Sequence, residues 1–255
     1  MASFVAEVLE ALERGHSTWG RADVVEALAV RVAPSAADNA EAVRRLVDAA
    51  SDELLAEPDV VCLGAEGLTV PDVLRRRDGL SPIRRHGAAR YSTWRALHAE
   101  QAILEVTEAG RDAHVGVVAE PTVETAINDA GLGEDQAEAV RRLCQGGERV
   151  AVVVGPAGSG KFRSLAAARS AWEAADVAVR GVAPSAVAAG VLTEQAGIRS
   201  ETLAKFLLAT GRPGGALGRG EVVVCDEASM VSTRDLAKLV DLVEGAGPNW
   251  SWLDP

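Results

Sequence analysis

Residues 155–162 read GPAGSGKF. They follow an apolar run, ERVAVVV at 148–154, and precede a segment with helical periodicity that begins near Lys161. A glycine-rich turn with a lysine, placed between a strand and a helix, is typical of a loop that cradles phosphate. Its backbone N–H groups turn inward, and the helix N-terminus adds positive charge. The sequence therefore predicts a strand at 148–154 followed by a phosphate-binding loop.

The last residue of this loop departs from the usual pattern. The position after the lysine normally carries Ser or Thr, whose hydroxyl binds Mg²⁺. Here the residue is Phe162, which has no side-chain oxygen and a ring much larger than a threonine side chain. We therefore expect Mg²⁺ binding to be weakened at this loop.

A second motif lies downstream, where EVVVCDEASM at 221–230 reads as an apolar strand that ends in two carboxylates. Asp226 can hold Mg²⁺, and Glu227 can polarise an attacking water. Alone, the glycine loop could be a simple turn and the acidic pair a solvated strand end. Together, 65 residues apart from Lys161 to Asp226, they indicate a nucleoside-triphosphatase fold.

The chain between and around the two motifs alternates between helical and apolar segments. Apolar strands alternating with helices predict a parallel sheet covered on both faces, hence an α/β fold of the P-loop NTPase class. We expect strands at 177–183 and 221–225, and helices at 134–145, 161–175, 185–196, 200–209 and 232–244.

The N-terminal part reads as mainly helical. Apolar spacing predicts a helix at 2–13, a second helix capped by Ser17 or Thr18, and a third capped by Asp38, followed by a strand at Val60–Leu63. This pattern suits either a small helical or winged-helix-like module or a plain helical lead-in. We expect three parts: 1–74, an Arg-rich connector and helix at 75–130, capped near Ser92 or Thr93, and the P-loop domain at 131–255.

Charge is unevenly distributed along the chain. The net charge of −11 argues against a general nucleic-acid coat protein. Residues 75–95, however, hold seven Arg and one Asp, with Tyr91 and Trp94 available to stack on bases. This stretch is either a solvated connector or part of a surface that binds single-stranded DNA.

The sequence shows no disulfide or metal-binding pattern of cysteines, no signal peptide and no apolar run long enough to span a membrane. The three cysteines are far apart and in no metal-binding spacing, the N-terminus lacks a basic segment followed by an apolar one, and no run approaches the ~18 apolar residues of a membrane span. We expect a cytoplasmic protein without a membrane partner.

Four stretches resemble the helicase part of conjugative relaxase–helicases, which are RecD-like superfamily 1 DNA helicases. The resemblance is carried by GVAPSAVAAGVLTEQAGIRSETLAKFL (181–207) and VVVCDEASMVSTRDLAKLV (222–240), and extends to RYSTWRALHAEQAIL (90–104) and STWGRADVVEALAVRV (17–32). It implies a first RecA-like motor domain with ATP and Mg²⁺ as cofactors and single-stranded DNA as partner.

The resemblance also implies roles for individual residues. Gln136 corresponds to the glutamine that contacts adenine, Asp226 to the Mg²⁺ ligand and Glu227 to the catalytic residue that activates water. Pro184, Ser185 and Thr202 correspond to segments near single-stranded DNA. Lys161 corresponds to the catalytic lysine at the phosphates, and the nucleotide-binding loop implied by the resemblance comprises Gly155, Pro156, Ala157, Gly158, Ser159, Gly160, Lys161 and Phe162.

The sequence also departs from this family. Phe162 is one departure. In addition, we recognise neither the motifs of the second motor domain nor a relaxase module in the 255 residues. The only tyrosine is Tyr91, and the histidines, which are His16, His86, His98 and His114, are scattered, so we expect no DNA nicking. We expect a truncated helicase fragment that at best binds ATP, with a non-catalytic DNA-binding fragment as the alternative. A stand-alone P-loop kinase or small ATPase is disfavoured by the ASMVST segment at 228–233.

The tail after residue 247 reads PNWSWLDP, where the family has a strand resembling KLVLVGD. Codons for this tail, read from the third base of the proline codon, can encode Lys-Leu-Val-Leu-Val-Gly. We hypothesise a frameshift here. The nucleotide sequence of the gene tests this, and a shifted frame without helicase motifs would exclude it.

Overall fold

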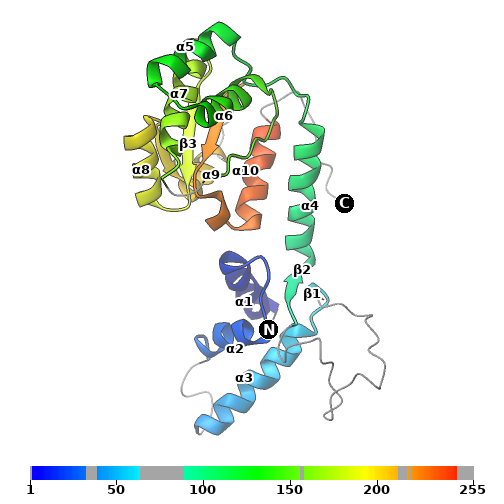
Figure 1. The fold of residues 1–255 in the computed structure, drawn as a ribbon. Helices are drawn as coiled ribbons and strands as arrows, with labels where there is room; N and C mark the ends of the chain where they lie inside the picture. Colours follow the sequence, from blue (N-terminus) through cyan, green and yellow to red (C-terminus); the bar gives the residue numbers. More distant parts are fainter. Residues whose placement is uncertain are drawn as a thin grey trace, which may run out of the picture. The chain divides into compact units, whose positions relative to one another are not determined.

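The computed structural model describes residues 2–32, 39–63, 89–155, 158–211, 217–218 and 220–245 (Figure 1). Two segments lie outside these residues: the tail at 246–255, and residues 64–88, which include most of the Arg-rich stretch at 75–95. The chain folds as two compact units, Met1–Ala99 and Glu100–Pro255. The helix α4, Trp94–Ala109, runs across this division, and Thr93 Oγ1 accepts a hydrogen bond from Ala96 N near its start. The three-part division drawn from the sequence stays a prediction.

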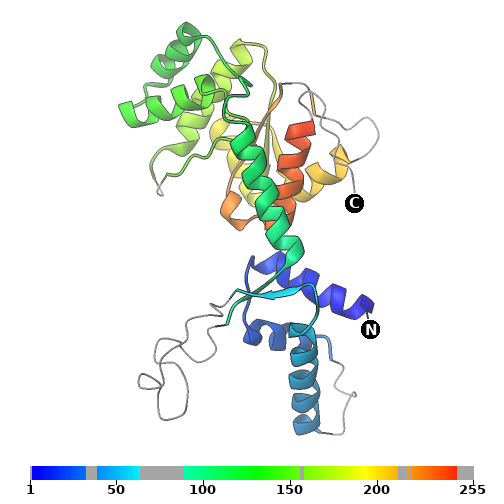
Figure 2. The ribbon, with the colours of Figure 1, turned by 90° about the vertical axis from the view of Figure 1, so that its right-hand side faces the viewer.

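The first unit contains three helices and a short antiparallel pair of strands. The helices are α1 (Ala2–Gly15), α2 (Arg21–Ala29) and α3 (Ala40–Leu55). Strand β1 (Val60–Cys62) pairs with β2 (Tyr91–Thr93). Figure 2 shows the three helices, in blue, gathered around this pair.

Two of the predicted helix caps are corrected by the structure. Helix α2 begins after Gly20, whose backbone N–H donates to the Asp23 carboxylate, and not after Ser17 or Thr18. For α3, the cap is Asn39, whose side chain accepts from Ala42 N at 2.9 Å, while Asp38 lies outside the described residues. In both cases a neighbouring residue with extended backbone makes the capping contact, which periodicity alone locates only approximately.

Trp19 is the centre of the first unit's core. Its side chain is fully buried and stacks on Tyr91, with ring centroids 5.9 Å apart. The backbones of the two residues exchange hydrogen bonds, at 3.0 Å and 2.7 Å, as an isolated antiparallel bridge. The Tyr91 ring is therefore engaged in packing within the first unit.

The second unit is a three-layer α/β domain. Its sheet has the order β4-β3-β5, with all pairs parallel: β3 is Val179–Ala183, β4 is Ser200–Thr202 and β5 is Val222–Cys225. The helices are α5 (Glu120–Ala130), α6 (Glu134–Gln145), α7 (Lys161–Ala174), α8 (Ala186–Ala196), α9 (Leu203–Thr210) and α10 (Thr233–Gly245), with the short 3₁₀ helix η3 (Ala228–Met230) after β5.

The two faces of the sheet are covered by different helices, because side chains alternate along β5. Val222 and Val224 pack with residues of α5, α6, α7 and α8. Val223 and Cys225 pack with residues of α9 and α10. Figure 1 shows the ribbons of α9 and α10 near the sheet. The predicted α/β P-loop class, with a parallel sheet preceded along the chain by a mainly helical N-terminal region, is confirmed.

Two element predictions in this unit are wrong. Residues 148–154 form no strand, and Val152 and Val154 are 80% and 91% exposed. A strand needs a neighbour to bond its backbone, and among the described residues β5 pairs only with β3. Residues 200–209 begin as strand β4 and become helical only at Leu203, because Thr202 caps α9.

An ion pair ties β3 to the start of β5. Arg180 donates to both carboxylate oxygens of Glu221, at 2.9 Å for Nη2, and Gly218 N donates to the same carboxylate at 2.8 Å. The Glu221 side chain is 8% exposed. The hydrogen bond from Arg180 holds the pKa of Glu221 below its usual value.

We expect Glu221→Gln to lower the free energy of unfolding by about 1–3 kcal/mol at neutral pH, because Arg180 loses its anionic partner. The folded-state pKa of Glu221 is lowered, so its contribution is present above the unfolded pKa and is lost as the pH falls through the folded pKa. The difference from wild type should therefore shrink on acidification. Urea unfolding at neutral and acid pH measures it.

The matched control is Glu173→Gln, which breaks an exposed pair with Arg169 on the surface of α7. This change should cost no more than about 0.5 kcal/mol. Equal effects of the two substitutions would contradict a special role for Glu221.

Candidate nucleotide-binding site

The glycine loop has the backbone shape that a phosphate cradle requires. Gly158 and Gly160 both adopt φ of +79°, which side chains other than glycine rarely tolerate. A Cβ at Gly155 would lie 2.6 Å from Ser159 Oγ, so the two ends of the loop are close. Pro156 and Ala157 lie outside the described residues. Helix α7 follows directly, and its N-cap, Gly160, makes no side-chain hydrogen bond to it, which leaves the positive end of the helix available to an anion.

Gln136 anchors the N-terminal end of α6 to this loop. Its Nε2 donates to the backbone carbonyl of Ser159 at 2.9 Å, and its Oε1 accepts from Gly133 N at 3.3 Å. The glutamine that the sequence assigns to adenine thus lies beside the glycine loop, with its amide engaged by the protein.

Arg163 makes a second connection to the loop region, which the sequence analysis missed. Its Nη2 donates to the carbonyls of Ala130, at 2.7 Å, and Gly131, at 3.1 Å. These carbonyls end α5, where a cation is favourable because it satisfies free carbonyls at the negative end of a helix. Gln136 therefore holds the glycine loop, and Arg163 holds the first turn of α7 that follows it. A signal was present in the sequence, since Gly131 is a typical helix terminator.

Lys161 and Asp226 meet as an ion pair between the start of α7 and the end of β5. The Lys161 ammonium contacts Asp226 Oδ1, and it also lies 5.1 Å from the centre of the Phe162 ring. The Asp226 side chain is 5% exposed and that of Lys161 32%. Asp226 N donates to Val182 O at 2.9 Å, which fixes the residue at the carboxyl edge of the sheet. The two motifs of the sequence analysis therefore form one site.

Glu227 is exposed and has an unusual backbone. Its φ is +54° and ψ +37°, in the left-handed region, and its carbonyl accepts from Met230 N at 2.9 Å in η3. Such strain in a residue other than glycine is often found at functional sites. Glu227 stands next to the buried Asp226, but its role as a catalytic base stays a prediction.

Phe162 points toward apolar neighbours. Its partly buried ring packs against a cluster formed by Leu165, Leu192, Ala196 and Ile198. A Mg²⁺ ion prefers six oxygen ligands, and Phe162 offers none, while Asp226 is already paired with Lys161. Within the described part of the chain, no three His, Cys, Asp or Glu side chains are grouped to hold a metal. The residues present do not fit the metal site that such a loop usually completes.

Two of the residues assigned to single-stranded DNA use their hydroxyls inside the fold. Ser185 caps α8, accepting from Ala188 N at 3.1 Å, and Thr202 caps α9, accepting from Lys205 N at 3.3 Å. Ala183 and Thr202 are partners across the parallel strands β3 and β4. Pro184, Ser185 and Thr202 therefore share the carboxyl edge of the sheet with Asp226, the edge at which α/β domains bind ligands.

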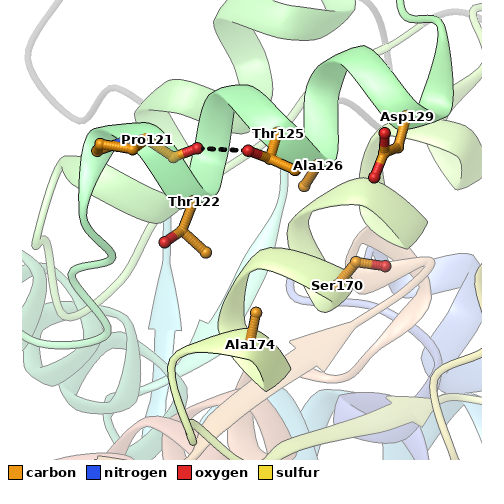
Figure 3. Close-up of a pocket in the computed structure, with 7 residues that line it drawn as sticks. All are labelled: Pro121, Thr122, Thr125, Ala126, Asp129, Ser170 and Ala174. Carbon is orange, nitrogen blue, oxygen red and sulfur yellow. Dashed lines mark hydrogen bonds between the residues drawn. The ribbon is translucent and has the colours of Figure 1, made fainter.

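Other candidates are not brought to this site. His98 lies beside Trp94, with ring centroids 6.1 Å apart, and His86 lies outside the described residues. A shallow hollow between α5 and α7, drawn in Figure 3, lies along the C-terminal half of α7, away from Lys161. It is lined by Pro121, Thr122, Thr125, Ala126, Asp129, Ser170 and Ala174.

No helix in the described ranges is long and apolar enough to cross a bilayer.

Fold and site together define a P-loop nucleotide-binding domain. The profile of the AAA domain family matches residues 131–249. Curated relatives are a probable conjugal transfer protein TraA of Sinorhizobium fredii, 36% identical over 151 residues, and the conjugal transfer protein TraA of Agrobacterium fabrum, 36% identical over 160 residues. A third, from Rhizobium radiobacter, is 40% identical over 116 residues.

These alignments cover 59%, 62% and 46% of this chain, but only 14%, 14% and 10% of the respective relatives. The chain thus spans only a small part of the relatives' length, and its similarity to these conjugal transfer proteins covers about half to three fifths of its own residues.

We expect Gly160→Ala to lower stability, because an alanine at φ +79° costs about 1–2 kcal/mol. Its Cβ would also lie 2.2 Å from Gln136 Nε2, so the hydrogen bond to Ser159 should break. Adding Gln136→Ala removes this clash but not the backbone strain, so the double variant should still unfold more easily than Gln136→Ala alone. Thermal unfolding measures all three.

Gly190→Ala is the matched control. Gly190 lies inside α8, and a Cβ there would meet nothing within 4 Å. This change should raise stability by about 0.5–1 kcal/mol. Gly160→Ala as stable as wild type would show that the loop does not hold the left-handed conformation.

Proposed function

We propose that this chain is the nucleotide-binding part of a conjugative DNA helicase, which binds ATP but hydrolyses it no faster than background on its own. The observation that carries the proposal is the pairing of Lys161, at the start of α7 behind the glycine loop, with the buried carboxylate of Asp226 at the end of β5. A cation, a helix N-terminus and a carboxylate at a sheet edge are the parts from which P-loop sites are built.

Each residue has a proposed role in binding. The backbone of the glycine loop and the Lys161 ammonium hold the phosphates, and Gln136 contacts the adenine. Gln136 lies one hydrogen bond from Ser159, so base and phosphate sites adjoin. ATP is proposed because the resemblance assigns Gln136 to adenine.

Weak or absent hydrolysis is proposed from Phe162. Phosphoryl transfer depends on a metal ion that neutralises the charge developing on the phosphates. With no hydroxyl after Lys161, the protein supplies one oxygen ligand fewer. Glu227 could orient a water, but that water would lack a metal-polarised phosphate to attack.

DNA is the proposed macromolecular partner. Three curated relatives are named for conjugal transfer, and Pro184, Ser185 and Thr202 lie at the carboxyl edge of the sheet. We propose that single-stranded DNA passes along this edge. Because the hydroxyls of Ser185 and Thr202 already cap helices, the DNA would be contacted by backbone groups and by other exposed groups in the first turns of α8 and α9.

Non-catalytic binding of single-stranded DNA through the Arg-rich stretch is the second candidate, and it has less support. Trp94 is 49% exposed, as a stacking residue should be. However, Tyr91 stacks on Trp19, and Arg95 contacts Glu13 at 3.1 Å and Asp59 at 3.5 Å. An affinity for single strands that falls steeply with salt and drops in Trp94→Ala would favour this candidate.

We expect Lys161→Ala to weaken the binding of a fluorescent ATP analogue by about tenfold or more, the loss expected for a charge-assisted hydrogen bond. ATP turnover by the wild-type chain should equal that of Lys161→Ala, with or without single-stranded DNA. Fluorescence titration and phosphate release measure the two quantities.

Lys205→Ala serves as the control, because Lys205 is an exposed lysine of α9 that pairs with Glu201 at 3.2 Å. Its affinity for the analogue should match wild type. DNA-stimulated turnover that disappears in Lys161→Ala would refute the inactive assignment, and unchanged binding in Lys161→Ala would refute the site.

A further inference from the structure

The charge arrangement at the glycine loop is complete without a metal ion. When a cation-dependent site holds nucleotide and metal, a carboxylate like that of Asp226 faces the metal, and the lysine contacts the phosphates. Here the Lys161 ammonium contacts Asp226 Oδ1 directly. The buried carboxylate therefore already has a countercharge, which it needs because an unpaired charge is costly at 5% exposure.

Phe162 reinforces this arrangement from the other side. Its ring lies 5.1 Å from the Lys161 ammonium, within the range of a cation–π attraction. The same ring packs into the apolar cluster of Leu165, Leu192 and Ile198. At the position where a Ser or Thr hydroxyl would bind hydrated Mg²⁺, this chain has an aromatic ring that contacts the Lys161 ammonium.

A nucleotide can bind this loop through groups that need no metal. The backbone around Gly158 and Gly160 and the open N-terminus of α7 attract phosphate oxygens. Lys161 is 32% exposed, so its ammonium can be shared between phosphate and carboxylate. Asp226 then acts against binding, because its negative charge repels the phosphates and retains the lysine.

We propose that the glycine loop of this chain takes a nucleoside di- or triphosphate in its metal-free form, with Lys161 and not a divalent cation as the countercharge of Asp226. The inference rests on the proposed nucleotide-binding function and specifies the ligand of the same site. It makes two statements that a cation-dependent site contradicts: Mg²⁺ does not tighten binding, and removal of the Asp226 charge strengthens it.

The test is a titration of the full chain with a fluorescent ADP analogue, once with excess EDTA and once with millimolar MgCl₂. The two affinities should agree within about twofold, a difference too small to represent a metal contact. Tightening by Mg²⁺ of about tenfold or more overturns the inference but leaves the proposed function intact. Absence of binding under both conditions overturns both.

Asp226→Asn provides the second arm. In EDTA it should bind the analogue about tenfold more tightly than wild type, because one negative charge close to the phosphates is removed. Weaker binding than wild type, with thermal unfolding showing a folded chain, overturns the inference, since it would mark Asp226 as a group that favours the ligand.

The third arm compares two substitutions of Phe162 and does not depend on the stability of Asp226→Asn. Phe162→Thr introduces the hydroxyl that Mg²⁺ lacks, so its affinity should become several-fold tighter with Mg²⁺ than with EDTA. Phe162→Leu removes the ring but adds no oxygen, so it should stay indifferent to Mg²⁺. Equal indifference in both variants overturns the assignment of metal independence to Phe162.

Discussion

The ion pair between Lys161 and Asp226 joins the two halves of the second unit's site. Asp226 directly follows β5, an outer strand of the described parallel sheet, and Lys161 begins the helix that covers one face of that sheet. Because the carboxylate is almost fully buried, it constrains where α7 can begin. The start of α7 is consequently held at the carboxyl edge of the sheet, the edge at which β3 and β4 also end.

The rest of the unit supports this junction from both faces of the sheet. The valines of β5 alternate between the helices α5 to α8 on one side and α9 and α10 on the other. Arg163 attaches the first turn of α7 to the C-terminal end of α5, and Gln136 attaches the glycine loop to the N-terminal end of α6. The glycine loop is therefore held both by contacts from neighbouring helices and by the left-handed backbone of its own glycines.

Much of the fold was predictable from the sequence, because the long helices carry clear periodicity and apolar strands that alternate with helices indicate a parallel sheet. The order of the strands within that sheet was not predicted. Helix α6 has the predicted bounds. The predicted strand at 148–154 does not form, because an apolar run indicates a preference for strand but does not supply the neighbouring strand that its backbone needs. The approach of Lys161 to Asp226 was implied by the motifs. The contacts of Gln136 and Arg163 were not, because they depend on side-chain positions that only tertiary packing sets.

The hydrogen bond from Gln136 to the Ser159 carbonyl has a consequence for how a ligand is sensed. One amide group serves the loop that faces phosphates and is also the group assigned to the base. A base that bonds to the Gln136 amide must change the hydrogen bond between this amide and the loop. Phosphates that alter the loop must, in turn, change the affinity of the amide for the base. Thermodynamic reciprocity makes these two effects equal in size, so recognition of the purine and of the phosphate chain would be a single coupled event.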